Sequence, residues 1–290
     1  MRIASNKLSD LHTFYKNELT SIYEPNEINS IFELVCDHYL QYNKTTIKQR
    51  INENINQSDL IKIYNTCLEL KTGIPIHYIL NEAYFFDSKF MVNKDVLIPR
   101  PETEELVDII LKTLKENNQS NITILDIGTG SGCIPIILKK HLPLAKVFGI
   151  DVSKKALTVA NKNSSNLKQE VHFSEINILT EGLGDAKYSV LVSNPPYVLK
   201  SEAIQMENHV LLHEPHLALF VEDTDPIIFY KRIIDLCEKN LEEKGWLFFE
   251  LNPLYCNEVS NYAITSKLFI FSEILKDMSG KQRFFKAQKK

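Results

Sequence analysis

The sequence predicts an α/β fold in which a mostly parallel sheet follows a small helical region. From about residue 121 onward, short apolar segments of strand length alternate with helical segments, an order typical of a parallel sheet covered by helices. The first 80 residues instead space their apolar side chains as helices do. Between these regions, residues 82–98 are rich in aromatic and β-branched side chains, which predicts a β-hairpin.

Composition places the chain among ordinary globular proteins of one or two domains. It has 290 residues, 44% of them hydrophobic and 24% charged. The net charge of -4 disfavours a protein whose main task is to grip a nucleic-acid backbone, because such proteins present a basic face. The five cysteines are far apart and odd in number, which predicts buried, reduced thiols. No apolar run of membrane-spanning length and no signal-peptide core occur, so we expect a cytoplasmic protein without membrane contact.

Residues 1–80 are predicted to form a helical domain. Pro25 precedes apolar residues at helical spacing and suits a first helical turn. Ser58 and Asp59 are candidate caps for a second helix that ends near Gly73. Isolated helices of this length need partners, so we expect a small bundle. It contains no obvious catalytic cluster, which favours a role in recognition or simple packing.

The hairpin, residues 81–98, is predicted to link this bundle to a domain at 99–290. Pro99 and Pro101 punctuate the chain after the hairpin, and Thr103 opens a helix. Arg100 and Glu102 lie in this stiff segment. The sequence leaves two roles open for them: lining a ligand pocket, or forming a salt bridge and a helix start.

The second domain contains the alternating segments. The predicted helices after the one at Thr103 are 132–140, 153–160 and 227–241, and the predicted strands are 122–125, 146–150, 171–173, 188–193 and 246–250. Two further strands near the end, 267–275 and 283–287, would add an antiparallel edge to the parallel sheet.

A glycine-rich loop, Asp126–Gly132, follows the first of these strands and opens a helix. Its glycines permit a tight turn and a close approach of backbone to ligand. Asp151 ends the next strand, where a carboxylate can accept hydrogen bonds from both hydroxyls of a ribose. A glycine-rich turn without ligand is the simpler alternative, but Asp151 at this place predicts nucleoside binding.

The spacing of the glycines distinguishes two cofactor classes. Dinucleotide sites use G-x-G-x-x-G, in which a helix N-terminus faces a pyrophosphate. Here the pattern is G-x-G-x-G, and Asp126 lies just before it. S-adenosylmethionine carries a sulfonium and an ammonium group but no phosphate, and a nearby carboxylate suits that positive charge. The loop therefore favours S-adenosylmethionine.

Asn194-Pro195-Pro196-Tyr197 follows the apolar segment 188–193. Two prolines cannot continue a sheet, so Asn194 should lie at the carboxyl end of the strand, outside which ligands bind in such folds. The asparagine and the rigid carbonyl groups after it form a fixed array of acceptors that suits a planar NH₂ group, either an amide or an exocyclic base amine. A simple Asn-Pro turn is the alternative.

The histidines His209, His213 and His216 lie near Glu214 and suggest a metal site, but we favour the interpretation that they line or border the substrate loop. We therefore predict no metal.

Together these segments resemble the bacterial release-factor glutamine methyltransferases. The resemblance covers about residues 73–287 and rests on the following segments: Gly73–Ile79, Val96–Glu104, Asp126–Gly132, Ser193–Tyr197, Glu214–Phe220 and Lys276–Arg283. The Asn-Pro-Pro-Tyr motif is shared with DNA adenine methyltransferases, whereas the Ile98-Pro99-Arg100-Pro101 stretch is specific to the protein-modifying family. The chain departs from the family pattern at His77, at Asn177 and in the loop 221–226.

The resemblance implies a class I, Rossmann-like methyltransferase domain with a small N-terminal helical domain for substrate recognition. It implies methyl transfer from S-adenosylmethionine to the amide nitrogen of the glutamine in the Gly-Gly-Gln loop of peptide chain release factors. Asn194, Pro195 and Tyr197 are the implied catalytic residues, with Pro196 also at the substrate. The implied cofactor residues are Arg100, Glu102, Asp126, Gly128, Thr129, Gly130, Asp151, Asn177 and Asn194.

The sequence has to be weighed against three rival functions. A DNA adenine methyltransferase must flip a base out of duplex DNA and needs a basic surface, which the acidic balance disfavours. A non-catalytic module that binds release factor would not need an intact Asn194 motif. Methylation of a glutamine in a different protein is a third, weaker alternative.

Overall fold

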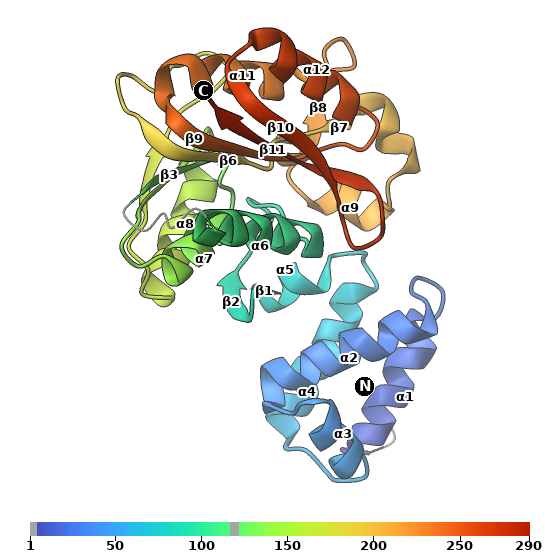
Figure 1. The fold of residues 1–290 in the computed structure, drawn as a ribbon. Helices are drawn as coiled ribbons and strands as arrows, with labels where there is room; N and C mark the ends of the chain where they lie inside the picture. The colour runs from blue at the N-terminus through green and yellow to red at the C-terminus, as the bar shows by residue number, and fades with distance from the viewer. Residues whose placement is uncertain (1–4, 117–121) are drawn as a thin grey trace. The chain divides into compact units, whose positions relative to one another are not determined.

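The computed structural model describes residues 5–116 and 122–290, and the chain forms two compact units (Figure 1). The first unit contains the chain up to Asn81 together with Glu207–His213. The second contains Glu82–Met206 and Glu214–Lys290. The first four residues lie outside the described residues, and they belong to the N-terminus in which the sequence shows no signal-peptide core. Residue 121, where the predicted alternation of strands and helices begins, also lies outside them.

The first unit is a helical bundle with its own apolar core. Leu8, Leu11, Tyr15 and Ile63 are among its fully buried side chains. Its helices are α1 (Leu8–Leu19), α2 (Pro25–Leu40), α3 (Lys44–Arg50), α4 (Gln57–Leu70), α5 (Ile76–Leu80) and α9 (Asn208–His213).

Helix starts in this unit show one prediction confirmed and one wrong. Pro25 is the first residue of α2, as predicted. The cap of α4 is Asn56, whose side chain accepts a hydrogen bond from the backbone N–H of Asp59 at 2.9 Å. Ser58 lies inside the helix. Asn56 is the N-cap because its backbone is extended and its side-chain oxygen reaches the N–H of Asp59 in the first turn of the helix.

The predicted hairpin consists of β1 (Glu82–Phe85) and β2 (Ser88–Met91), which pair antiparallel. Phe86 and Asp87 form the turn, with φ values of 50° and 55°. Strand pairing ends at Met91, and the rest of the predicted hairpin is loop. Phe85 and Phe90 bury their rings in the core of the second unit.

A seven-stranded sheet in the order β10-β11-β9-β6-β3-β4-β5 is the centre of the second unit. The five strands from β9 to β5 are parallel, and β11 and β10 add the predicted antiparallel edge. The strands are β3 (Thr123–Ile127), β4 (Lys146–Asp151), β5 (His172–Glu175), β6 (Tyr188–Ser193), β9 (Leu241–Glu250), β10 (Phe269–Lys276) and β11 (Gln282–Lys289). The predicted α/β class with a mostly parallel sheet is therefore confirmed.

Helices cover both faces of this sheet (Figure 1). Val190 and Val192 of β6 face one apolar core, shared with α6 (Pro101–Glu116) and α7 (Cys133–His141). Leu191 faces the opposite core, shared with α11 (Ile228–Asn240) and α12 (Cys256–Ser266). This alternation follows from the two-residue period of a strand. The remaining elements are α8 (Lys154–Asn166), β7 (Val198–Leu199), η1 (Lys200–Gln205), α10 (His216–Leu219) and β8 (Phe220–Val221).

The strand order reverses between β3 and β6, because β3 connects onward to β4 on one side while β6 connects onward to β9 on the other. In open parallel sheets the crevice at such a reversal, outside the carboxyl ends of the strands, is where ligands bind. The glycine-rich loop follows β3 and Asn194 follows β6, so both predicted motifs lie at this edge.

Two findings bear on the other predictions from composition. All five cysteines are buried and unpaired, as expected. No helix in the described ranges is long and apolar enough to cross a membrane.

Candidate active site

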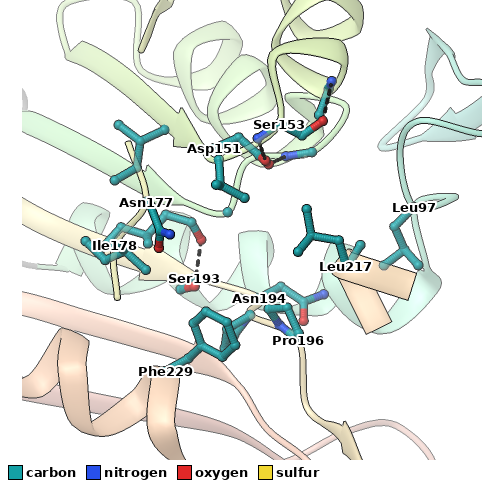
Figure 2. Close-up of a pocket in the computed structure, with 18 of the residues that line it drawn as sticks. Leu97, Asp151, Ser153, Asn177, Ile178, Ser193, Asn194, Pro196, Leu217 and Phe229 are labelled. Carbon is teal, nitrogen blue, oxygen red and sulfur yellow. Dashed lines mark hydrogen bonds between the residues drawn. The ribbon is translucent and has the colours of Figure 1, made fainter. Parts of the chain in front are cut away.

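A cavity of about 240 Å³ lies at the carboxyl edge of the sheet, within the second unit (Figure 2). Residues at or just after the ends of β3, β4, β5 and β6 line it, and three segments from elsewhere in the unit, 95–97, 215–218 and 229–233, complete it. Its lining residues are Asp95, Val96, Leu97, Ile127, Gly128, Gly130, Ile150, Asp151, Val152, Ser153, Ala156, Ile176, Asn177, Ile178, Leu179, Ser193, Asn194, Pro195, Pro196, Pro215, Leu217, Ala218, Phe229 and Ile233.

The glycine-rich loop forms one wall of the cavity. Gly128 and Gly130 have φ values of 78° and 54°, a region that residues with a Cβ rarely occupy. A Cβ at either position would meet nothing within 4 Å in the protein, so the backbone here borders open space. A ligand can therefore approach the main chain at these two residues closely. Thr129, between them, is buried and does not line the cavity.

Asp151 ends β4 and joins the glycine-rich loop to the start of the next helix (Figure 2). One of its carboxylate oxygens accepts the N–H of Gly130 at 2.9 Å, and the other accepts the N–H of Ser153 at 2.9 Å. Burial raises the pKa of Asp151, and these backbone hydrogen bonds oppose the rise. Each oxygen retains lone-pair capacity, so the carboxylate can still accept from two adjacent hydroxyls.

Asp126 is fully buried beneath the loop and does not itself line the cavity. Neither of its carboxylate oxygens has a hydrogen-bond partner of ordinary geometry, although the nearby hydroxyl of Thr129 partly stabilises the charge. Burial is the main reason that the pKa of Asp126 rises to about 7, and the charge of Asp151 adds to the rise. A buried carboxyl group without partners is costly, so a cation nearby would be favourable.

Asn177 and its neighbour Ile178 both line the cavity (Figure 2). Its side-chain oxygen accepts the N–H of Leu179 at 3.1 Å, and its backbone N–H donates to Glu181 at 2.9 Å. The bond to Leu179 directs the amide NH₂ of Asn177 away from that turn. A donor of this kind can meet the ring nitrogens of a purine, which leaves the predicted adenine contact open to test.

Asn194 lies just past β6, and its side-chain amide is held in one orientation. The NH₂ group donates to Glu250 at 2.9 Å and to the hydroxyl of Thr103 at 3.1 Å. Both amide hydrogens are thereby directed away from the cavity that Asn194 lines. The carbonyl oxygen is the group left to face a ligand, and it can only accept a hydrogen bond.

Pro195 and Pro196 line the cavity next to Asn194, whereas Tyr197 does not. The hydroxyl of Tyr197 donates to Glu250 at 3.1 Å, and its ring packs against the core on the α11 face of the sheet. Burial raises the pKa of this phenol. Tyr197 therefore reaches the site through Glu250, and its predicted packing against substrate stays a prediction.

Arg100 and Glu102 do not line the cavity. Arg100 pairs with the buried carboxylate of Glu214 at 2.5 Å, and the same carboxylate accepts the N–H of Ile98 at 3.3 Å. Glu102 lies in the first turn of α6. The structure therefore contains the second of the two roles left open: Arg100 forms a salt bridge and Glu102 lies at a helix start. A cofactor contact by either residue stays a prediction.

Sequence reasoning missed several residues of this site. Glu250 was taken only as the end of a core strand and Thr103 only as a helix start, yet both hold Asn194. Phe229 lines the cavity from a segment that carries no motif, and Leu97 lines it from the motif segment Val96–Glu104, where it was given no role (Figure 2). The signal available for Glu250 was an acidic residue at the end of an apolar strand, the same signal that identified Asp151.

Across the described residues, no group of three or more histidine, cysteine, aspartate or glutamate side chains has the arrangement of a metal site. His209 lies 3.3 Å from Glu207 in the first unit, and Glu214 is engaged by Arg100 in the second.

Comparison with known proteins identifies the family. A profile described as "Methyltransferase small domain" matches residues 104–221. The chain is 41% identical over 281 residues to the release factor glutamine methyltransferase of Flavobacterium psychrophilum, covering 96% of this chain and 98% of the relative. It is 37% identical over 283 residues to the protein of that name from Bacteroides thetaiotaomicron, covering 97% and 100%. The chain belongs to the release factor glutamine methyltransferase family. The sequence resemblance is thereby confirmed.

Solved structures support the fold of this family member. The catalytic domain of hMettl16, in complex with MAT2A 3'UTR hairpin 6, matches with a TM-score of 0.53 at 15% identity, covering 81% of this chain and 82% of that one. The T. thermophilus 16S rRNA N2 G1207 methyltransferase, in complex with AdoMet and guanosine, matches with a TM-score of 0.51 at 14% identity, covering 72% and 50%. At such identities the likeness establishes the class I methyltransferase fold alone.

Proposed function

We propose that this protein transfers a methyl group from S-adenosylmethionine to the side-chain amide nitrogen of the glutamine in the Gly-Gly-Gln loop of peptide chain release factors. The observation that carries the proposal is the fixed amide of Asn194, which turns a lone acceptor toward the cavity. A glutamine amide presents two N–H donors, and an acceptor array is what such a group requires. Relatives that share almost the whole chain are named release factor glutamine methyltransferases.

The residues around the cavity fit S-adenosylmethionine. Gly128 and Gly130 leave open space along the backbone, and Asp151 offers a carboxylate that can accept from ribose hydroxyls. Asp126 supplies a buried, unpartnered carboxyl group near the loop, which a sulfonium and an ammonium group would favour. The cofactor supplies an electrophilic methyl group on a cationic sulfur. Its adenine would lie near Asn177 and Ile178.

The chain's own residues supply orientation more than acid–base chemistry. An amide nitrogen is a poor nucleophile, because its lone pair is delocalised into the carbonyl group. The oxygen of Asn194 and the backbone carbonyl of Pro195, each accepting one N–H, would hold the nitrogen with its lone pair toward the methyl carbon. The proton becomes acidic only as the new bond forms, so no strong base is needed first. Positioning of the reacting atoms then provides much of the rate.

The first unit is the proposed recognition domain, which would contact the release factor outside the Gly-Gly-Gln loop. Its separate core and the absence of its residues from the cavity lining are compatible with that role. Release factors act at the ribosome, so the protein would meet its substrate in the cytoplasm.

The test is mass spectrometry of purified release factor after incubation with this protein and S-adenosylmethionine. We expect a single methyl increment on the peptide that contains Gly-Gly-Gln. With Asn194→Ala we expect turnover to fall by about 10² to 10³, comparable to the loss of one transition-state hydrogen bond in other enzymes. Cofactor affinity, measured by calorimetry, should change little in that variant.

Two alternative acceptors are tested in parallel, and methyl transfer to either of them would count against the proposal. A release factor whose loop glutamine is replaced by alanine should accept no methyl group. Plasmid DNA should also accept none, and incorporation into DNA alone would instead favour the adenine methyltransferase.

A further inference from the structure

Glu250 is a buried carboxyl group that lies beside Asn194 without lining the cavity. Its position follows from the sheet register, in which Phe249 of β9 is paired with Ser193 of β6. The residue after each of these is therefore a neighbour at the carboxyl edge. Only 1% of the surface of Glu250 is exposed, so its oxygens depend on protein donors.

One oxygen of Glu250 belongs to a closed triangle of hydrogen bonds. The hydroxyl of Thr103 donates to it at 2.7 Å, and the NH₂ of Asn194 donates to it at 2.9 Å. The same NH₂ donates to the hydroxyl of Thr103 at 3.1 Å. A carboxylate can only accept, and the single hydrogen of Thr103 is already committed to it. Nitrogen is therefore the only atom of the Asn194 amide that satisfies both neighbours.

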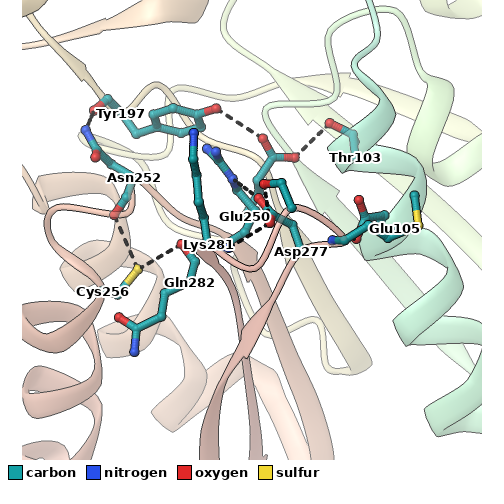
Figure 3. Close-up of polar contacts among 12 residues, drawn as sticks. Thr103, Glu105, Tyr197, Glu250, Asn252, Cys256, Asp277, Lys281 and Gln282 are labelled. Atoms are coloured by element: carbon teal, nitrogen blue, oxygen red, sulfur yellow. Dashed lines mark hydrogen bonds and ion pairs between the residues drawn. The ribbon is translucent and has the colours of Figure 1, made fainter.

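The second oxygen of Glu250 is held from the opposite side (Figure 3). The hydroxyl of Tyr197 donates to it at 3.1 Å, and the hydroxyl of Tyr230 donates to the backbone carbonyl of Glu250 at 3.0 Å. Burial raises the pKa of Glu250, and the charge of Glu102 raises it further. The hydrogen bonds from Thr103 and Tyr197 and the positive charge of Arg283 lower it. The carboxyl group is thus fixed in place before any ligand enters.

We propose that Glu250 is a positioning residue that dictates which atom of Asn194 faces the substrate. By holding the NH₂ group, it keeps the carbonyl oxygen of Asn194 toward the cavity, and the site then selects a group that donates hydrogen bonds. A rotated amide would place oxygen against the carboxylate of Glu250, leave the neighbours unsatisfied and offer the substrate a donor. The expected effect on kcat rests on the proposed function, whereas the orientation of the Asn194 amide does not.

The kinetic test uses a reciprocal exchange of the amide and the carboxylate. In Asn194→Asp, two buried carboxyl groups meet, and in Glu250→Gln the amide can turn its oxygen or its nitrogen toward Asn194. We expect kcat on the Gly-Gly-Gln peptide to fall at least about 30-fold in the first variant and about 10-fold in the second. In the double variant, the introduced amide can donate to the introduced carboxylate and to Thr103. The contact between two buried carboxyl groups is then removed, and an oxygen of residue 194 still faces the substrate.

We therefore expect the double variant to be more active than Asn194→Asp alone, with a coupling between the two changes of at least 10-fold. The KM for S-adenosylmethionine should remain within about threefold of wild type in Glu250→Gln. Losses that simply multiply in the double variant would overturn the proposal. So would a normal kcat in Glu250→Leu, which removes both acceptors.

Glu202→Gln is the matched control. Glu202 also accepts from an asparagine side chain, but from Asn252, at 3.3 Å, and neither residue lines the cavity. Its exchange should leave kcat within about threefold of wild type. An equal loss in Glu202→Gln and Glu250→Gln would assign the effect to general packing of this edge and reject a specific role for Glu250.

A second measurement does not depend on activity. In protein labelled with ¹⁵N-asparagine, the side-chain NH₂ signal of Asn194, identified by its loss in Asn194→Ala, should exchange slowly with solvent in the wild type. In Glu250→Leu it should exchange at least about tenfold faster, while the Asn252 signal is unchanged. Unchanged exchange at Asn194 would reject the positioning role. If the wild type is inactive and Glu250→Leu still loses this protection, the proposed function alone is rejected.

Discussion

Asp126 is the residue whose protonation is favoured by its burial in the fold and disfavoured by the proposed cationic ligand. Its carboxyl group is buried without a partner of ordinary geometry, and burial raises its pKa to about 7. The unfolded chain would hold this group near its ordinary pKa of 3.8. Between these two pH values the folded state keeps a proton that the unfolded state loses, so this group favours folding less as the pH rises.

Asp126→Asn tests this linkage, because the amide has nearly the same shape and does not titrate. We expect the free energy of unfolding of the wild type to fall, relative to the variant, as the pH increases from about 4 to about 7. The expected slope is about 1.4 kcal/mol for each pH unit over which only the folded state holds the proton. Urea denaturation at several pH values measures it. Parallel pH profiles for the two proteins would show that Asp126 is already ionised in the folded state.

The same residue predicts how ligand affinity depends on pH. A cationic ligand near Asp126 favours its ionised form, so the affinity of the wild type for S-adenosylmethionine should increase as the pH rises toward 7 and then level off. Asp126→Asn should bind more weakly and without this dependence. Calorimetry in buffers of different ionisation heat would detect the proton released on binding. Equal affinity of both proteins at pH 8 would place the cationic groups away from Asp126.

At the scale of elements, the loop between β3 and α7 combines backbone strain with ligand access. Gly128→Ala would put a side chain at a φ of 78°, which costs roughly 1 to 2 kcal/mol, and would project a methyl group into open space beside the cavity. We expect a loss of stability and, in addition, at least a tenfold weaker affinity for S-adenosylmethionine.

Gly184→Ala separates these two effects. Gly184 has a φ of 62°, also meets nothing within 4 Å, and does not line the cavity. It should lose similar stability in thermal unfolding and retain its affinity for the cofactor. If both variants lost affinity equally, general destabilisation would account for the result at Gly128.

The start of α4 provides an element-scale test in the first unit. Asn56→Ala removes the acceptor for the N–H of Asp59 and should cost about 1 kcal/mol. Ser58→Ala, a change inside the helix that involves no cap, should be close to neutral. Hydrogen exchange of the α4 amides reports both values. A larger loss of α4 stability in Ser58→Ala than in Asn56→Ala would identify Ser58 as the cap, as the sequence alone had suggested.

At the scale of the whole molecule, the chain separates its two tasks into two units. Every residue that lines the cavity belongs to the second unit, although Glu207–His213 leaves that unit in sequence and groups with the first. The grouping of α9 with the first unit was not visible in the sequence, because a short helix within a loop carries no sign of the unit with which it groups. Cofactor binding should therefore be independent of the core of the first unit.

Leu11→Ala tests this independence. Leu11 is fully buried in the core of the first unit, and such a truncation typically costs about 2 to 5 kcal/mol. We expect faster hydrogen exchange throughout α1 and α4, with an unchanged affinity for S-adenosylmethionine. Leu191→Ala, in the core of the second unit, is the reciprocal control and should weaken binding. A large loss of affinity in Leu11→Ala would show that the two units fold as one.

The sequence by itself determined the fold class, the strands of the seven-stranded sheet, and the motifs at the ends of β3, β4 and β6. It could do so because these features depend on local rules: side-chain periodicity, the φ that glycine permits, and the inability of proline to continue a strand. Asp151 and Asn194 were identified for this reason, since each directly follows or ends an apolar strand.

Only the tertiary structure decided which side chains support those motifs. The bond between Thr103 and Glu250 joins residues 147 apart in the chain, and it exists only because α6 packs beside the edge where β9 adjoins β6. The isolation of Asp126 is likewise a property of what surrounds it and not of its neighbours in sequence. Hydrogen-bond partners and burial arise from strand register and helix packing, which no short stretch of sequence contains.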